Sequence, residues 1–311
     1  MIKKTSKYII FCIVFTLLLP ISCKNSNSEG REGTLVIKEI QLVEIPSMIT
    51  DPESRSKYAS EHFWDNFDFN DSTYLADKYK MANHLATYLQ ILSLTTQEIA
   101  EKSLTDFTTK FTRGDATLRS FFLEEAQNIL YDPNSMERNE ALYISFLKNI
   151  TASRNIDDIT KEKYRFQLEL ALKNRPGATA IDFQYIDDTG RVSSLHKTNG
   201  EYILLFFFEP GCSACKDIKS GILESPTFKD IGDRLTYLAV YTGEDYNAWK
   251  ESITEYPPGW ITAHDMEQEL VNNNLYDLRA SPTMYLLDSR YQVLLKDPDL
   301  FQLNNYLSAL R

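Results

Sequence analysis

The sequence predicts an α/β domain, built on a central mixed sheet flanked by helices, that follows a mainly α-helical domain. Between about residues 51 and 173, apolar residues recur at gaps of three and four, the spacing of amphipathic helices. Beyond Gly177 the pattern changes, because short runs rich in β-branched and aromatic residues now alternate with helical segments. Such alternation of strand and helix is typical of the α/β class.

The helical half contains apolar stripes separated by turns. Turn signals stand at residues 112–115, 132–135 and 153–155, and residues 174–177 (NRPG) close the section. We therefore predict five or six helices in a domain spanning residues 34–172, with residues 35–45 as one extended segment leading into it. The stripes are Leu75, Tyr79, Ala82, Leu85, Leu89 and Leu92; Leu118, Phe122, Ala126 and Ile129; Tyr143, Leu147 and Ile150; and Tyr164, Leu168 and Ala171.

The run from Tyr202 to Phe208 is the strongest strand signal of the second half. It holds no polar group apart from the Tyr hydroxyl, so we expect a strand buried on both faces, in the middle of a sheet covered by helices. We assign residues 173–311 to this second domain. Further strands are predicted at residues 180–186, 192–195, 235–241, 260–263, 283–287 and 292–295, and helices near residues 214–223, 246–253, 268–274 and 300–310.

Cys212-Ser213-Ala214-Cys215 directly follows this run, where the strand is expected to give way to a helix. The thiolate is the form of cysteine that attacks disulfides, and a helix N-terminus stabilises it through unpaired N–H groups and the helix dipole. The position therefore indicates redox chemistry. A CxxC is also half of a common zinc site, but the four histidines show no paired spacing beside it, so we predict neither a metal nor another cofactor.

Residues 1–22 have the pattern of an export signal, with three lysines before an apolar stretch at residues 8–19. An uncleaved membrane anchor is the alternative, but about 12 apolar residues are short of the roughly 20 needed to span a bilayer. Residues 20–23 (PISC) resemble the lipobox of bacterial lipoproteins, in which the cysteine becomes the lipidated first residue. We therefore expect acylation of Cys23, a flexible tether at residues 23–33, and a periplasm-facing location in the bacterial cell envelope.

Cleavage would leave Cys212 and Cys215 as the only free thiols, because Cys12 departs with the signal and Cys23 carries lipid. A bridge across two residues constrains little of the unfolded chain, which favours a working thiol pair over a structural staple. The mature chain would carry 30 basic and 44 acidic residues, a net charge of −14. Nucleic acid is therefore a poor candidate partner, since its binding needs clustered positive charge.

Residues 206–218 (FFFEPGCSACKDI) and 278–288 (LRASPTMYLLD) resemble the thioredoxin superfamily, in particular its membrane-tethered TlpA and ResA type. The resemblance covers about residues 178–311 and implies a thioredoxin-like domain with Pro282, after a cis peptide bond, beside the dithiol. It implies that Cys212 is the exposed attacking thiolate and Cys215 the buried resolving thiol. The backbone of Ser281 would then pair with an extended substrate peptide.

The sequence departs from the thioredoxin pattern at two positions. Gly211 stands where the family usually has Trp, and Phe206 stands where thioredoxin has a buried Asp that manages protons. Glu209 and Lys216 are the nearest ionisable residues. Lys216 either stabilises the Cys212 thiolate or faces solvent, and Glu209 either relays a proton or faces solvent.

A weaker resemblance concerns residues 62–69 (HFWDNFDF), which are similar to the opening of helical domains that precede thioredoxin folds in uncharacterised lipoproteins of gut bacteria. No activity comes with this likeness. We expect Phe63, Trp64 and Phe67 to be core residues, and we do not expect His62 and Asp65 to form a catalytic pair.

Together these features imply a lipid-anchored thiol–disulfide oxidoreductase that reduces exported proteins and is re-reduced by a membrane electron donor. Two alternatives stay open: an oxidase or isomerase of the same fold, and a scaffold protein that binds partners through its helical domain. Related CxxC folds span reduction potentials from about −270 to −120 mV, so the motif alone leaves the direction of electron flow open. The TlpA likeness favours a reductant.

Overall fold

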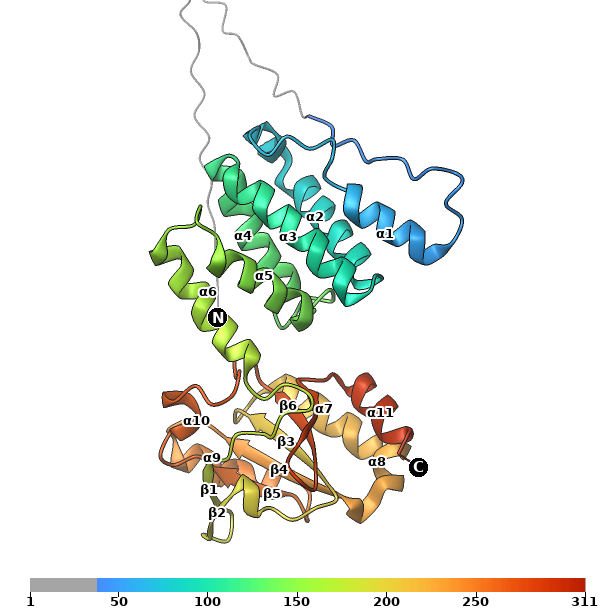
Figure 1. Ribbon diagram of the computed structural model, residues 1–311. Coiled ribbons are helices and arrows are strands. Elements are labelled where there is room, and N and C mark those ends of the chain that lie inside the picture. Colours follow the sequence, from blue (N-terminus) through green and yellow to red (C-terminus); the bar gives the residue numbers. More distant parts are fainter. Residues whose placement is uncertain (1–37, 311) are drawn as a thin grey trace, which may run out of the picture. The chain divides into compact units, whose positions relative to one another are not determined.

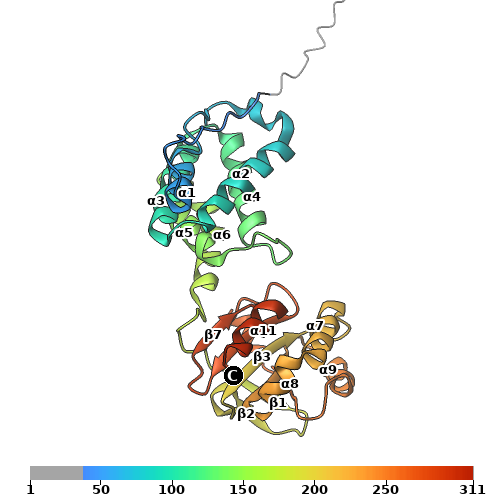
Figure 2. The same ribbon diagram turned by 90° about the vertical axis from the view of Figure 1, so that its right-hand side faces the viewer.

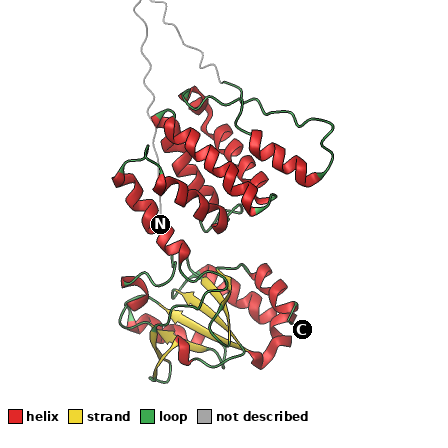
Figure 3. Ribbon diagram, in the orientation of Figure 1, coloured by secondary structure: helices red, strands yellow, loops and turns green. Residues whose placement is uncertain are grey.

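The computed structural model describes residues 38–310 and confirms the predicted fold class, a mainly helical part followed by an α/β part (Figures 1 and 3). The predicted export signal, the tether and Cys23 lie outside the described residues. The domain boundaries stay predictions; the last helix of the helical part ends at Leu172 and the first strand begins at Gln184.

Six α-helices and one 3-10 helix make up the described helical part, in agreement with the predicted number. Polar side chains mark where they begin. Asp115 accepts hydrogen bonds from the N–H groups of Thr117 and Leu118, and Thr96 accepts one from Ile99, so otherwise unpaired N–H groups of the first turn are satisfied. The helices are α1 (Pro52–His62), η1 (Ser72–Asp77), α2 (Lys78–Ser93), α3 (Gln97–Arg113), α4 (Ala116–Leu130), α5 (Glu140–Ala152) and α6 (Asp158–Leu172).

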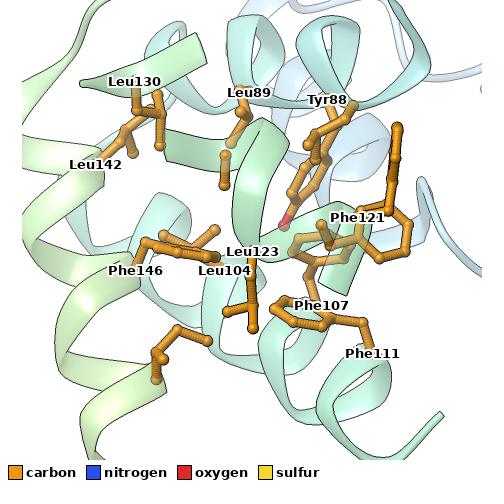
Figure 4. Packing of buried hydrophobic residues seen from close by; sticks show 14 of the residues in the cluster. Tyr88, Leu89, Leu104, Phe107, Phe111, Phe121, Leu123, Leu130, Leu142 and Phe146 are labelled. Carbon is orange, nitrogen blue, oxygen red and sulfur yellow. The ribbon is translucent and has the colours of Figure 1, made fainter. Parts of the chain in front are cut away.

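An aromatic cluster fills the core of the helical part. Trp64 is 4% exposed and stacks on Phe107, with ring centroids 4.7 Å apart, and Phe107 meets Phe122 edge to face. Figure 4 shows Tyr88 of α2, Phe107 of α3 and Phe146 of α5 within this core. The prediction that the aromatic side chains after His62 are core residues is therefore confirmed.

The assignment of one residue, Tyr79, to a buried apolar stripe is wrong. Tyr79 is 79% exposed, although its spacing from Leu75 and Leu85 suggested a shared helix face. Leu75 belongs to η1, which turns every three residues, and α2 begins only at Lys78. The change of helix type places Tyr79 on the solvent side, while Leu85, Leu89 and Leu92 of α2 are buried.

Seven strands of the described chain form one mixed sheet, in the order β2-β1-β5-β4-β3-β6-β7. Strand β3 lies between β4, to which it is parallel, and β6, to which it is antiparallel. The strand predicted at residues 180–186 begins only at Gln184, because the Ala180 N–H pairs with the Tyr291 carbonyl outside the named strands. The strands are β1 (Gln184–Asp187), β2 (Val192–Ser194), β3 (Tyr202–Phe208), β4 (Leu235–Tyr241), β5 (Ile261–His264), β6 (Thr283–Asp288) and β7 (Val293–Lys296).

Helical residues pack against both faces of β3, as its uniformly apolar sequence predicted. Figure 2 shows α7, α8 and α11 beside the sheet. Leu204, Phe206 and Phe208 point into a core with residues of α7, α8 and α11, whereas the side chains between them face a second core with Leu270 of α10. The helices are η2 (Leu195–Lys197), α7 (Ser213–Glu224), α8 (Pro226–Ile231), η3 (Gly232–Arg234), α9 (Tyr246–Ser252), η4 (Ile253–Glu255), α10 (Glu269–Asn272) and α11 (Leu300–Ser308).

Helix α8 was not predictable from the apolar spacing of its residues. Its first residue is Pro226, which after a serine is also typical of a turn, but proline is well tolerated in the first turn of a helix because its missing N–H would be unpaired there. Across residues 38–310, none of the helices combines the length and the apolar character that crossing a bilayer requires.

Candidate functional site

The dithiol lies at the turn from β3 into α7. Cys212 is the N-cap of α7, and its sulfur accepts a hydrogen bond from the Cys215 N–H at 3.0 Å. The Cys212 N–H in turn donates to the Glu209 carbonyl at 3.2 Å, which closes the turn after the strand. The sulfur therefore lies where the unpaired N–H groups and the dipole of α7 stabilise negative charge, as the sequence predicted.

Cys212 and Cys215 form a disulfide, with their Cα atoms 5.3 Å apart. The two sulfur-bearing residues differ in accessibility, because Cys212 is half-buried whereas Cys215 is 5% exposed. Cys215 lies in the first turn of α7 and faces the core that contains Phe206 and Phe208. An incoming disulfide can thus reach Cys212 more easily than Cys215, and the roles of attacking and resolving cysteine stay predictions.

Pro282 lies beside the dithiol. The Ser281–Pro282 peptide bond is cis, as the resemblance implied, and the Ser281 carbonyl oxygen lies 3.5 Å from the Cys212 sulfur. Strand β6 follows this proline and runs antiparallel to β3, with Thr283 opposite Phe207. The start of β6 is therefore held next to the end of β3, and the fold brings together all three residues that the sequence analysis assigned to the described site.

Gly211 has φ +76°, in the left-handed region that favours glycine. A β-carbon built there would meet no atom within 4 Å, so the backbone conformation and not the space restricts this position. A tryptophan, the usual residue of the family, would be strained with this backbone. The turn conformation thus explains one of the two departures from the thioredoxin pattern.

Phe206, the second position that departs from the thioredoxin pattern, makes the buried side of the dithiol apolar. Phe206 is fully buried and packs edge to face against Trp260, with ring centroids 6.0 Å apart. Glu209 is exposed as a residue, yet partial desolvation of its carboxyl group raises its pKa, against the opposing effect of a hydrogen bond from Thr242. Lys216 is exposed and faces solvent.

Sequence reasoning missed Lys219, which is 9% exposed on α7. Its ammonium donates to the Glu255 carbonyl at 2.6 Å and lies 4.3 Å from the centre of the Tyr256 ring. Burial lowers the pKa of Lys219. The available signal was its spacing of four from Cys215, which places both residues on one helix face.

No group of three or more His, Cys, Asp or Glu side chains is placed to hold a metal ion within residues 38–310. His62 and Asp65 do meet, with Nδ1 and Oδ2 2.7 Å apart, but both side chains are about two-fifths exposed and belong to the helical part. His264 is buried against the Gly243 carbonyl, at 2.8 Å from its Nε2.

The second half of the chain combines a mixed sheet flanked by helices with a Cys212–Cys215 disulfide at a strand-to-helix turn. A thioredoxin-like protein from Bacteroides caccae, known from a crystal structure, is 33% identical to this chain. The match covers 88% of this chain and 100% of the Bacteroides caccae chain, with a TM-score of 0.84. The chain therefore belongs to the thioredoxin-like proteins.

Two other solved structures match the second half alone. The C-terminal domain of an uncharacterized protein from Bacteroides fragilis is 39% identical and covers 43% of this chain and 98% of that chain, with a TM-score of 0.43. The thioredoxin domain of a thiol-disulfide oxidoreductase from Bacteroides vulgatus is 24% identical to this chain. The match covers 44% of this chain and 97% of that chain, with a TM-score of 0.39. Residues 21–174 match a domain of unknown function, DUF5106. No curated protein matches the chain significantly.

Proposed function

We propose that this protein is a lipid-anchored thiol–disulfide oxidoreductase that reduces disulfides in exported proteins. The observation that supports the redox role most directly is the placement of the Cys212 sulfur. It is half-buried at the N-terminus of α7 and lies 3.5 Å from the Ser281 carbonyl, next to a buried partner cysteine. This arrangement supplies a stabilised thiolate, a resolving thiol and a main-chain segment within one site.

The reduction proceeds in two exchanges. The Cys212 thiolate attacks one sulfur of the substrate disulfide, and the other substrate sulfur leaves as a thiolate. The Cys215 thiolate then attacks the Cys212 sulfur, which releases the second substrate thiolate and forms the Cys212–Cys215 disulfide. Two electrons pass from the dithiol to the substrate. A membrane electron donor must reduce the enzyme before the next cycle.

The substrate we propose is an extended segment of an exported protein. The main chain of Ser281 borders the Cys212 sulfur, so a peptide that pairs with this backbone would bring its disulfide to the site. Main-chain pairing gives affinity with little dependence on side chains, and we therefore expect broad substrate selection.

The location in the cell envelope rests on the first 23 residues. Three lysines, a short apolar stretch and the Ser22-Cys23 pair are the pattern of a lipoprotein signal. Acyl chains on Cys23 would hold the mature protein on the membrane, facing the periplasm. Mass spectrometry of the N-terminal peptide should find lipid on Cys23, and Cys23→Ala should lose membrane attachment; an intact residue 1–23 segment in the mature protein would contradict this.

The reduction potential tests the direction of electron flow. Equilibration of the Cys212–Cys215 pair in glutathione buffers should give a potential below that of the glutathione couple. A value well above that couple would instead support an oxidase or isomerase of the same fold. Each tenfold change in the equilibrium constant corresponds to about 30 mV, so the two outcomes are well separated.

A further inference from the structure

Lys219 is a buried cation on the helix that carries the dithiol. It is 9% exposed, and its ammonium is held by the Glu255 main-chain carbonyl and the face of the Tyr256 ring. A buried ammonium is costly unless it is compensated, and the carbonyl and the ring compensate it without neutralising its charge. The Glu255 carboxylate offsets part of that charge and favours the protonated form of Lys219.

Cys215 lies about one turn earlier than Lys219 on the same face of α7. Residues four apart on a helix have Cβ atoms about 5–6 Å from each other, and both of these residues are buried. The Tyr256 ring beside the Lys219 ammonium also packs against Phe208, at 4.8 Å between centroids, and Phe208 shares a core with Cys215. The ammonium thus lies beside a ring that packs on the core shared by Phe208 and Cys215.

Phe206 stands where thioredoxin has a buried Asp, so no acidic side chain occupies that position beside Cys215. A fully buried phenyl ring offers no charge and no proton to Cys215, whose thiol must ionise before it attacks the mixed disulfide. A cation in a partly desolvated site interacts more strongly with a thiolate than it would in bulk water. We propose that Lys219 is an electrostatic positioning residue that favours the thiolate of Cys215 in the reduced protein.

Other charged groups around the site act less directly. Lys216 adds positive charge from the exposed side of α7, where solvent screens it, and Glu209 adds negative charge from the turn before Cys212. Glu255 and Tyr256 face Lys219 from η4 and the residue that follows it. The proposal rests on the oxidoreductase function but does not depend on the direction of electron flow.

The unaltered full-length protein provides the first test. Coupling between two sites is reciprocal, so a Cys215 thiolate that Lys219 stabilises must in turn stabilise the Lys219 ammonium. Carbon-13 NMR of labelled lysine should show Lys219 titrating at higher pH in the reduced protein than in the oxidised protein. Identical titration of Lys219 in the two redox states would overturn the proposal.

Variants provide the second test, in a Cys212→Ser background with labelled cysteine. Lys219→Met should lower the ionisation constant of the Cys215 thiol about tenfold, and Lys219→Arg, which keeps the charge, should restore most of it. Lys216→Met is the matched control and should change that constant less than twofold. Equal effects of Lys219→Met and Lys216→Met, or no effect of either, would refute the role of Lys219.

Thermal melting would verify that each variant is folded before its titration. Neither NMR measurement requires substrate or electron transfer. A protein that reduces no substrate yet shows the Lys219–Cys215 coupling would therefore contradict the proposed function and leave this inference standing. A protein that reduces substrates but shows no coupling would contradict this inference and leave the proposed function standing.

Discussion

The Ser281 carbonyl oxygen lies 3.5 Å from the Cys212 sulfur, although 69 residues separate the two in the chain. The antiparallel pairing of β6 with β3 produces this proximity, because β6 starts where β3 ends. The sulfur that we propose as the nucleophile and the backbone that would hold the substrate are therefore positioned by the same pair of strands.

Cys215→Ser should trap substrates on Cys212 as mixed disulfides, because the second exchange has lost its nucleophile. Cys212→Ser is the matched control and should trap little, since Cys215 is buried. Non-reducing gels followed by mass spectrometry of cells that express each variant would detect the adducts. If Cys215→Ser traps nothing while partners co-purify through residues 34–172, the scaffold function is favoured instead.

Gly211→Ala should destabilise the protein by about 1–2 kcal/mol, because φ is +76° at this position and an L-residue is strained there. Gly211→Asn should cost less, since asparagine tolerates left-handed backbone better than alanine does. Denaturant unfolding of both variants would measure the difference. Equal stability of Gly211→Ala and the parent protein would contradict this account of the missing tryptophan.

Stability should fall between about pH 6.5 and pH 4 in part because of His84. Burial lowers the pKa of His84 to about 4, so the folded state keeps the ring neutral while the unfolded state, with an ordinary pKa near 6.5, binds a proton as the pH falls. The contribution of His84 is therefore fully present above pH 6.5 and is lost progressively below it. His84 packs against Phe63 and Trp64, so His84→Phe keeps an aromatic ring in place.

The test is to compare the free energies of unfolding of the parent and His84→Phe at pH 7 and pH 4.5. The parent should lose on the order of 1–3 kcal/mol more than the variant over this interval. Parallel loss of stability in both proteins would show that His84 does not contribute, and that other titrating groups cause the acid sensitivity.

Asp115→Ala should cost about 1 kcal/mol of stability, because Asp115 accepts hydrogen bonds from the N–H groups of Thr117 and Leu118 at the start of α4. Asp115→Asn keeps a capping oxygen and should lose much less. Chemical denaturation of both variants would measure the effect. The reduction potential of the dithiol should be the same in both, and a shift would show that the helical part influences the redox site.

Much of the fold was predictable from the sequence because the relevant signals are local. The run from Tyr202 to Phe208 is apolar on both faces, which only a central covered strand satisfies, and the dithiol follows it at the start of a helix. The stripes of the helical half likewise predicted most of its core. Tyr79 was placed wrongly because apolar spacing does not distinguish a 3-10 turn from an α-helical turn.

The sequence by itself determined that two cysteines stand at a strand-to-helix turn, where a helix N-terminus favours the thiolate. Tertiary structure alone decided what surrounds those thiols. Lys219 is held by Glu255, 36 residues away, and Cys212 borders Ser281, 69 residues away. No periodicity encodes such contacts, because strand pairing and loop packing bring them together only when the whole sheet and its covering helices have formed.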